Sequence, residues 1–332
     1  MYDIITIGEI LAEILTEKLS QSLSSPGGLL GPFPSGAPAI AIDQAARMGA
    51  KTTIIAKIGA DDFGLLNKTR LRNDGVDVSH IIETGGNSTG TAFITYFPDG
   101  SRKYIFHLAH AACGELSPDD VKDELIKNTK FIHINGCSIT GSPSMGEAIM
   151  KAVRLAKKHH VKISFDPNIR TELFKGVLMD YYSEIIDSAD IILTGKSELE
   201  FLYRETGSAL TRLLEEKDRM VLIKDGANGT SVYTRREAFK VGPFPAITTL
   251  DATGAGDSFD GTFLALLCQG LDLRIAAIYG NAAGAKAVTK KGPMEGNSSR
   301  AELDEFVKEN PGIVAENTAM LYPGIPVSDQ GH

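Results

Sequence analysis

The sequence contains little cysteine and no long apolar run, and both shortages limit what the protein can be. Its three cysteines, Cys113, Cys137 and Cys268, are widely spaced and form no C-x-x-C pair, so neither a disulfide framework nor a cysteine-based zinc site is predicted. No apolar run approaches the roughly 18 residues that a membrane-spanning helix needs. The first residues carry no pattern typical of a secretory signal. We therefore expect a cytoplasmic protein.

An excess of basic residues is missing too. The chain of 332 residues has 34 Lys and Arg against 42 Asp and Glu, a formal net charge of −8. Because nucleic-acid and membrane-surface binders present basic patches, this balance argues against both classes of function. It does not exclude an anionic small substrate, since the local field at a site matters more than the total charge. The length suits one large α/β domain with an addition, or two domains.

Several common enzyme motifs are absent. Gly195-Lys196-Ser197 matches the end of a P-loop, but Asp190 stands where the first glycine belongs, and strand-like residues fill the loop. No G-x-G-x-x-G follows the first expected strand, and after Gly254-Ala255-Gly256 the third glycine is replaced by Phe259. H-E-x-x-H and G-x-S-x-G are also missing. A P-loop enzyme is rejected, and a dinucleotide-dependent dehydrogenase is a distant alternative.

Short β-branched runs alternate with helix-like stretches along most of the chain, which predicts a parallel sheet flanked by helices. Ser117-Pro118 and the capping box from Ser299 to Glu302 mark two helix starts. The expected strands are Ile4–Ile7, Thr52–Ala56, Phe131–Ile134, Val161–Phe165, Asp190–Thr194 and Met220–Lys224.

Two segments interrupt this alternation. Residues 10–38 are rich in Gly, Pro and Ser, and residues 89–108 contain two alternating apolar runs around Pro98-Asp99-Gly100. Asp-Gly supplies the turn of a hairpin. Both segments fit a small β-rich subdomain inserted in the N-terminal half, although an ordinary edge hairpin would have the same sequence.

The stretch TLDATGAGDSFDGTF, residues 248–262, carries the strongest chemical signal. Phe259 and Phe263 follow helical spacing, so Gly254–Gly256 would lie at the start of a helix. Free backbone N–H groups and the partial positive charge at that end suit a phosphate group. A tight loop is the alternative, and the flanking acids make it less favoured. Asp257 would then be a first-turn acid of this helix, whose end helps keep the carboxylate ionised, and Asp260 is expected to face solvent.

DATGAGDSFDGTFLA resembles the C-terminal signature of the PfkB/ribokinase family of carbohydrate kinases. In that family the Gly-rich turn stabilises the transferring phosphoryl group and the last Asp is the general base, which implies an anion hole at Gly254, Ala255 and Gly256 and a base at Asp257. Further family-like segments occur in the family's order, namely SGAPAIAIDQAARMGAK (35–51), IGADDFGLLNKTRLRNDGVDVSHI (58–81), DPNIR (166–170), KDGANG (224–229) and GNAAGAKAV (280–288).

The resemblance implies a ribokinase-like fold, a three-layer α/β/α core with a mostly parallel sheet plus a small β-sheet lid. We expect residues 1–9, 39–88 and 113–310 to form the core, 10–38 and 89–112 the inserted lid, and 311–332 a C-terminal tail. ATP and Mg²⁺ are the implied cofactors. A monovalent cation such as K⁺ near the loop of Asp251 is a further option, and pairing of the lid edges would give a homodimer.

The resemblance also implies contacts residue by residue, and each position has a purely structural alternative such as a turn, a salt bridge or a solvated edge. Arg170 would pair with phosphate or substrate through its planar fork. Glu200 would reach Mg²⁺ through water. The other implied substrate contacts are Glu13, Gly36, Ala37, Arg102, Tyr104 and His107, and the other nucleotide contacts are Lys224, Gly226, Gly229, Asn281, Ser197 and Asn168.

The sequence departs from the family pattern at three places. Ser35-Gly36 replaces Gly-Gly, Ile40 replaces a sugar-contacting Asn, and Ser197-Glu198-Leu199-Glu200 replaces Asn-x-x-Glu. We predict an ATP-dependent kinase acting on a primary hydroxyl of a small sugar or sugar acid, either a ketohexose such as tagatose or fructose or 2-keto-3-deoxygluconate. The alternatives are a nucleoside or riboside kinase, and a catalytically silent sugar- or nucleotide-binding regulator on the same fold.

Overall fold

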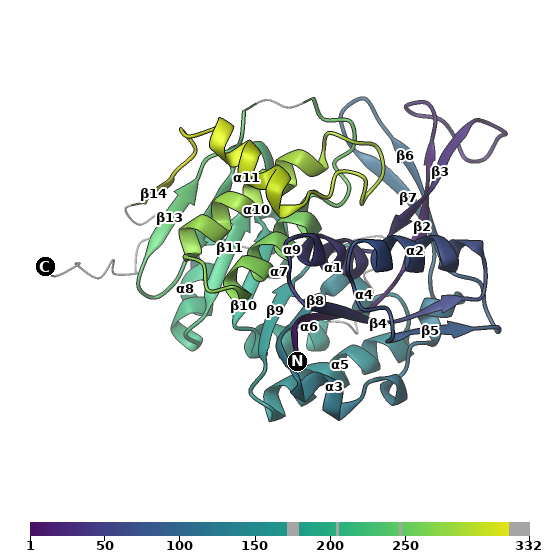
Figure 1. Cartoon of the computed structure of the whole chain (residues 1–332), viewed down its shortest axis with the longest axis horizontal. Coiled ribbons are helices and arrows are strands. Elements are labelled where there is room, and N and C mark those ends of the chain that lie inside the picture. The colour runs from purple at the N-terminus through teal and green to yellow at the C-terminus, as the bar shows by residue number, and fades with distance from the viewer. Residues whose placement is uncertain (171–178, 204–205, 246–247, 319–332) are drawn as a thin grey trace, which may run out of the picture.

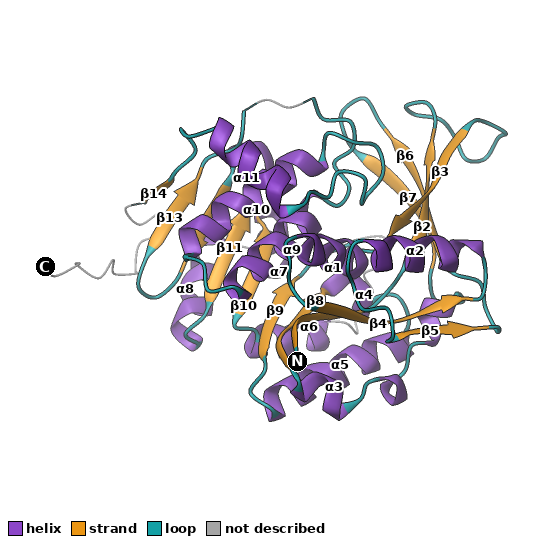
Figure 2. Cartoon of the chain, in the orientation of Figure 1, coloured by secondary structure: helices purple, strands orange, loops and turns teal. Residues whose placement is uncertain are grey.

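The protein, in a computed structural model, is built from one large sheet with helices on both faces and a separate small sheet (Figures 1 and 2). The structure describes residues 1–170, 179–203, 206–245 and 248–318. Within these ranges no helix is long and apolar enough to cross a membrane.

The large sheet has ten strands in the order β14-β13-β12-β11-β10-β9-β8-β1-β4-β5. The seven strands from β5 to β11 pair in parallel, and β12 to β14 add an antiparallel edge. Buried Val, Ile and Leu fill the central strands because helices cover both faces. The strands are β1 (Tyr2–Ile7), β4 (Thr52–Gly59), β5 (Ile81–Thr84), β8 (Thr129–Asn135), β9 (Lys162–Asp166), β10 (Ile191–Gly195), β11 (Met220–Lys224), β12 (Thr230–Tyr233), β13 (Ala238–Val241) and β14 (Ala315–Asn317).

The helices divide into two groups, each with its own apolar core against one face of the sheet. Side chains of α1, α9, α10 and α11 pack in one core, and those of α3, α5, α6, α7 and α8 pack in the other. The helices are α1 (Ala37–Arg47), α2 (Asp62–Asn73), α3 (Asp123–Lys127), α4 (Gly136–Ile139), α5 (Pro143–Lys158), α6 (Met179–Ser188), α7 (Lys196–Tyr203), α8 (Thr206–Glu216), α9 (Ala255–Cys268), α10 (Leu273–Ala287) and α11 (Arg300–Glu309).

The small sheet has the order β3-β2-β6-β7 and projects from one end of the large sheet (Figure 1). Its strands are β2 (Leu11–Thr16), β3 (Leu29–Ser35), β6 (Gly90–Tyr96) and β7 (Arg102–His107). They come from the two segments that interrupt the strand–helix alternation. The predicted hairpin is present, and Gly100 takes a left-handed φ of 82° in its turn.

The expected strands all exist, with ends that differ by a few residues. Ser299 begins α11 with the predicted capping box, whereas Ser117-Pro118 starts only a single 3-10 turn, Pro118–Asp120, before the chain turns into α3. The expected C-terminal tail, 311–332, contributes the edge strand β14, and its part from 319 onward lies outside the described residues.

Candidate active site

The predicted anion-binding turn, residues 254–256, lies at the N-terminus of α9. Gly254 is the N-cap residue and has a left-handed φ of 80°. A Cβ there would come within 2.4 Å of the Pro293 carbonyl oxygen, so both the backbone angle and the space require glycine. The helix begins at Ala255, which leaves the N–H groups of its first turn without partners inside the helix. The turn therefore offers the donors that an anion needs.

Asp257 is held in the first turn of α9 by amide groups from two strands. The Nδ2 atoms of Asn135, at the end of β8, and Asn168, after β9, lie 3.2 Å and 3.3 Å from the same oxygen, Oδ1. Its side chain is only 6% exposed. Burial, then the charge of Asp166, raises the pKa of Asp257 to about 7, against the opposing effects of Lys224 and Arg170. A carboxyl group of this kind changes charge near neutral pH.

This pKa limits the expectation that the helix end helps keep Asp257 ionised, because burial acts in the opposite direction. The partial charge of a helix terminus is worth about a kcal/mol, whereas full burial shifts a carboxyl pKa by several units. The carboxylate is poised near its titration point instead. Asn135 was not among the predicted residues, although an Asn at the carboxyl end of a central parallel strand is a signal for such a site.

Lys224 lies beneath the turn in a buried charge cluster. At the end of β11, its Nζ donates to Asp166 Oδ2 at 3.0 Å and to Asp260 Oδ1 at 2.9 Å. Both charges raise the pKa of Lys224 far above its usual range despite burial. The expected exposure of Asp260 is wrong, since its side chain is 0% exposed. The cause is that α9 packs between α1 and α10 and has no solvent face at that position.

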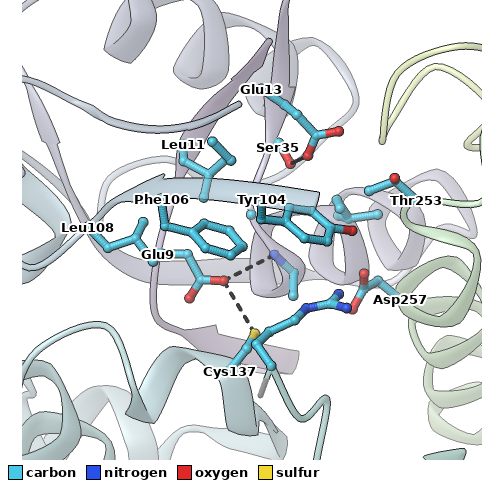
Figure 3. A pocket seen from close by; sticks show the side chains of 15 residues that line it. Glu9, Leu11, Glu13, Ser35, Tyr104, Phe106, Leu108, Cys137, Thr253 and Asp257 are labelled. Atoms are coloured by element: carbon cyan, nitrogen blue, oxygen red, sulfur yellow. Dashed lines mark hydrogen bonds between the residues drawn. The ribbon is translucent and has the colours of Figure 1, made fainter. Parts of the chain in front are cut away.

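A first cavity, the small-sheet pocket, lies between the small sheet and the start of α9 (Figure 3). Figure 3 shows Tyr104 and Phe106 across this pocket, with Asp257 and Thr253 to one side and Glu9 and Cys137 to the other. It is narrow, about 50 Å³. Its lining is Glu9, Leu11, Glu13, Ser35, Gly36, Ala37, Ile40, Ala92, Tyr104, Phe106, Leu108, Cys137, Arg170, Thr253 and Asp257.

Two buried acids give this pocket its polar character. Glu13 accepts a hydrogen bond from the Ser35 hydroxyl at 3.0 Å, while its Oε1 atom has no partner. Burial, then the charge of Asp251, raises the pKa of Glu13 to about 8. Glu9, which was not predicted, accepts from the Ser138 hydroxyl and from the N–H of Ala37. A ligand with several hydroxyl groups would satisfy the free oxygen of Glu13.

The start of α1 forms one wall of the same pocket. Gly36 caps this helix with a φ of 114°, and a Cβ there would lie 2.4 Å from the Glu9 carbonyl oxygen. Gly36 and Ala37 both line the pocket, and their contact with the substrate stays a prediction. Ile40 also lines it, so the departure from the family's Asn replaces an amide with an apolar contact.

Strand β7 separates the predicted lid residues into two sets. Arg102, Tyr104 and Phe106 are half-buried, and the alternate positions, including His107, are exposed. Because side chains alternate across a strand, His107 faces away from the pocket, and its position does not support the predicted contact with the substrate. The guanidinium carbon of Arg170 lies 5.6 Å from the centre of the Tyr104 ring, which places Arg170 in the pocket.

A second cavity, the α10 pocket, opens on the other side of the anion-binding turn. It has a volume of about 510 Å³, within the usual range for small-molecule sites. Its lining is Lys224, Gly226, Ala227, Gly229, Thr230, Pro243, Phe244, Pro245, Thr249, Ala252, Ala255, Gly256, Phe259, Asn281, Gly284, Ala285 and Val288. The predicted nucleotide contacts Lys224, Gly226, Gly229 and Asn281 thus meet in one cavity.

The other residues predicted to contact the nucleotide or the metal lie outside the α10 pocket. Asn168 contacts Asp257 rather than the α10 pocket. Ser197 and Glu200 are exposed on α7, while Glu198 between them is largely buried and accepts from the N–H groups of Ile169 and Gly195. The acid of this motif that lies nearest the charge cluster is therefore Glu198, and nearby Asp166 contributes to raising its pKa after the larger effect of burial. The described residues contain no group of three or more His, Cys, Asp and Glu able to hold a metal.

The chain matches known proteins over nearly its whole length. A model described as pfkB family carbohydrate kinase matches residues 1–300. The chain is 31% identical over 317 residues to a probable fructokinase-5 of Arabidopsis thaliana, covering 92% of this chain and 97% of that protein. It is 29% identical over 318 residues to a 5-dehydro-2-deoxygluconokinase of Clostridium perfringens, covering 93% of each.

Solved structures show the same fold. A putative ribokinase II from E. coli, in complex with ATP and Mg²⁺, is 40% identical with a TM-score of 0.88, covering 93% of this chain and all of that one, 100%. A fructokinase with bound ATP from Xylella fastidiosa has a TM-score of 0.83 at 23% identity, covering 94% of this chain and 100% of that one. The α/β fold with its separate small sheet is therefore ribokinase-like.

Proposed function

The chain belongs to the pfkB family of carbohydrate kinases, and we propose that it transfers the γ-phosphoryl group of ATP to a primary hydroxyl of a small sugar or sugar acid. As a carbohydrate kinase it is a phosphotransferase with an alcohol acceptor. The observation that carries the proposal is the position of residues 254–257 between two cavities. Asp257 lines the small-sheet pocket, and Ala255 and Gly256 line the α10 pocket. One helical turn thus faces an acceptor and a donor at the same time.

In this arrangement Asp257 is the general base. The two amides hold its Oδ1 atom, so the other oxygen is available to the proton of the attacking hydroxyl. With a pKa of about 7, the carboxylate accepts that proton near neutral pH without a large energetic mismatch. The backbone N–H groups of 254–256 stabilise the negative charge that develops on the phosphoryl oxygens.

The α10 pocket supports ATP as the donor. Lys224 lies beside Gly256 at the helix N-terminus, and the lining also contains the apolar residues Phe244, Pro245 and Val288. Such a lining suits both the triphosphate and the base of ATP. Mg²⁺ neutralises charge on the phosphate oxygens when it is bound. Glu198 and Asp166 are the nearby acids that would hold its waters, in place of the predicted Glu200, because Mg²⁺ keeps several waters and takes one or two carboxylates.

A monovalent cation near Asp251 stays a prediction. Both carboxylate oxygens of Asp251 already accept hydrogen bonds, from Tyr96 and the N–H of Thr253 on one oxygen and from the N–H of Gly292 on the other. Activity measured in K⁺ and in Na⁺ at equal ionic strength tests it. The homodimer through the small sheet, and the cytoplasmic location, likewise stay predictions, and sedimentation of the full chain tests the former.

The substrate class rests on relatives and on the pocket. The relatives include proteins named fructokinase and 5-dehydro-2-deoxygluconokinase, which favour a ketohexose such as fructose or tagatose, or a keto-deoxy sugar acid such as 2-keto-3-deoxygluconate. Glu9 and Glu13 offer acceptors to hydroxyl groups, and Arg170 offers donors to a carboxylate or phosphate. A riboside kinase is the second candidate, since it would need the same base and turn.

A coupled assay of ADP release over fructose, tagatose, 2-keto-3-deoxygluconate and ribosides tests the proposal. We expect sugar-dependent turnover, and a roughly 10²–10⁴-fold lower kcat in Asp257→Asn, the usual worth of a positioned base. Asp62→Asn removes a first-turn acid of α2 and is the matched control, with unchanged kcat. Full turnover by Asp257→Asn would mean that Asp257 is only a helix-end acid. Tight binding of ATP and sugar without any turnover would indicate the silent regulator.

A further inference from the structure

The small sheet touches the loop that precedes the anion-binding turn, through Tyr96 and Arg102. The Tyr96 hydroxyl donates to Asp251 Oδ1 and lies 2.8 Å from Thr253 Oγ1. Arg102 Nη1 donates to the same Thr253 oxygen at 3.1 Å. Asp251 and Thr253 are 2% and 7% exposed. These contacts join segments more than 150 positions apart in the sequence, and one of the partners, Thr253, also lines the small-sheet pocket.

Asp251 is the residue that fixes the path of this loop. Its Oδ1 accepts from the Thr253 N–H at 2.9 Å, and its Oδ2 accepts from the Gly292 N–H at 3.0 Å. Gly292 precedes Pro293, whose carbonyl oxygen is the atom nearest to a Cβ at Gly254. The carboxylate of Asp251 therefore ties together both segments that bound the anion-binding turn. A shift of this carboxylate would move the donors of 254–256.

Tyr96 supplies the hydrogen bond to Asp251 that comes from the small sheet. Burial, then the charge of Asp251, raises the pKa of the Tyr96 hydroxyl far above its usual range, so the hydroxyl stays protonated and donates. Tyr96 lies at the end of β6, beside the turn that leads to β7, whose Tyr104 and Phe106 cover the small-sheet pocket. The strand pair β6–β7, which covers the small-sheet pocket, thus also holds the loop that precedes the anion-binding turn.

We propose that Tyr96 is a positioning residue for phosphoryl transfer, acting through Asp251 to set the anion-binding turn when the small sheet covers the pocket. The inference rests on the proposed function. Misplacement of preorganised donors by a fraction of an ångström lowers transition-state stabilisation more than substrate binding. The loss of the Tyr96 hydroxyl should therefore reduce kcat and leave the Michaelis constants nearly unchanged.

Tyr96→Phe tests this role, with the sugar of the panel that the wild-type enzyme turns over fastest. We expect kcat to fall roughly 10-fold or more, the scale for a hydrogen bond to a charged group, with the KM for sugar and for ATP within about 3-fold of wild type. Tyr2→Phe is the matched control, because it removes a Tyr–Asp hydrogen bond to Asp77 far from the site, and its kcat should not change.

A double-mutant cycle shows whether Tyr96 acts through Asp251. The kcat of Tyr96→Phe/Asp251→Asn should equal that of Asp251→Asn alone. If Asp251→Asn does not fold, Thr253→Val takes its place in a cycle with Tyr96→Phe, and the same non-additivity is expected. A wild type that phosphorylates no sugar overturns the proposed function. An active wild type with a normal kcat in Tyr96→Phe, a change confined to the sugar KM, or fully multiplicative effects in the cycle overturns the positioning role alone.

Discussion

The two cavities on either side of residues 254–257 are lined by different kinds of residue. The small-sheet pocket is narrow and contains three buried carboxyl groups, Glu9, Glu13 and Asp257, together with the half-buried Arg170. The α10 pocket is about ten times larger, about 510 Å³ against about 50 Å³, and its walls are mostly glycine, alanine, proline and other apolar residues, with Lys224 as its cation. Polar groups that are buried and partly unsatisfied give strict recognition, because a wrong ligand leaves them unpaired.

The difference in lining indicates that the two pockets are suited to different substrates. Under the proposed function, the small-sheet pocket would select the acceptor through its acids, and the α10 pocket would hold the donor through its shape and through Lys224 and the helix N-terminus. Substitutions on one side should then change the kinetics of one substrate only, while substitutions in the shared turn should affect the chemical step itself. The predictions below run from the shared turn outward.

Gly254→Ala should have the largest effect, because the turn serves both pockets. We expect kcat to fall roughly 10²-fold or more, the scale for loss of an anion-hole donor, together with a lower melting temperature. Gly270→Ala is the matched control, since Gly270 has nearly the same φ, 79°, but open space around its Cβ position. It should cost about 1–2 kcal/mol of stability and no activity. Equal kcat values for the two variants would contradict the role of the turn.

Glu13→Leu should impair the use of the sugar and leave the binding of ATP unchanged. The variant removes the unpartnered Oε1 atom and leaves the Ser35 hydroxyl without its acceptor. We expect kcat/KM for the sugar to fall roughly 10- to 100-fold, the scale for one hydrogen bond to a buried charged or polar group, with the KM for ATP unchanged. Glu13→Gln, which keeps an acceptor, should lose less. A rise in the KM for ATP of the same size would show that the pockets are not independent.

Asn135→Leu should shift the pH dependence of the reaction. Asp257 acts when ionised, so activity is lost as pH falls through its pKa of about 7. Removal of the Asn135 donor destabilises the charged form and raises this pKa further. In the pH profile of kcat, the acid limb should move to higher pH, with a deficit of about 10-fold below pH 7, one unit of pKa, that shrinks toward pH 9. An unshifted limb would exclude Asn135 from the environment of the base.

Asn281→Ala should have the smallest effect, on the donor side only. The Asn281 amide donates to the carbonyl oxygens of Val241 and Gly242 and accepts from Thr230. Its hydrogen bonds are thus made within the protein, and it shapes the wall of the α10 pocket. We expect the KM for ATP to rise about 3-fold, since the worth of an internal hydrogen bond is modest, and the KM for the sugar to stay constant. A large loss for ATP would indicate direct recognition of the base by Asn281.

Part of the site could be predicted from the sequence because it depends on local order. The turn at 254–256, the place of Asp257 in the first turn of its helix and the glycines at 36 and 229 depend on neighbouring residues, since backbone angles and helix ends are local properties. The hairpin around Gly100 is local too. The alternation of side chains along β7 is local as well. Every second residue from Tyr104 lies on the same face of the strand, so the sequence favours Phe106 rather than His107 as a pocket residue.

The tertiary structure alone decided which side chains meet. Asn135 and Asn168 lie on different strands and converge on one oxygen of Asp257, and Tyr96 reaches Asp251 from a separate sheet. Asp260 is buried because α9 lies between two other helices. The pKa of Asp257 is set by burial and by charged residues that are far away in the sequence but close in space. The sequence by itself determined the fold class and the Gly-rich turn at the start of α9. Packing determined the charges and partners around that turn, because the electrostatic environment depends on what is near in space.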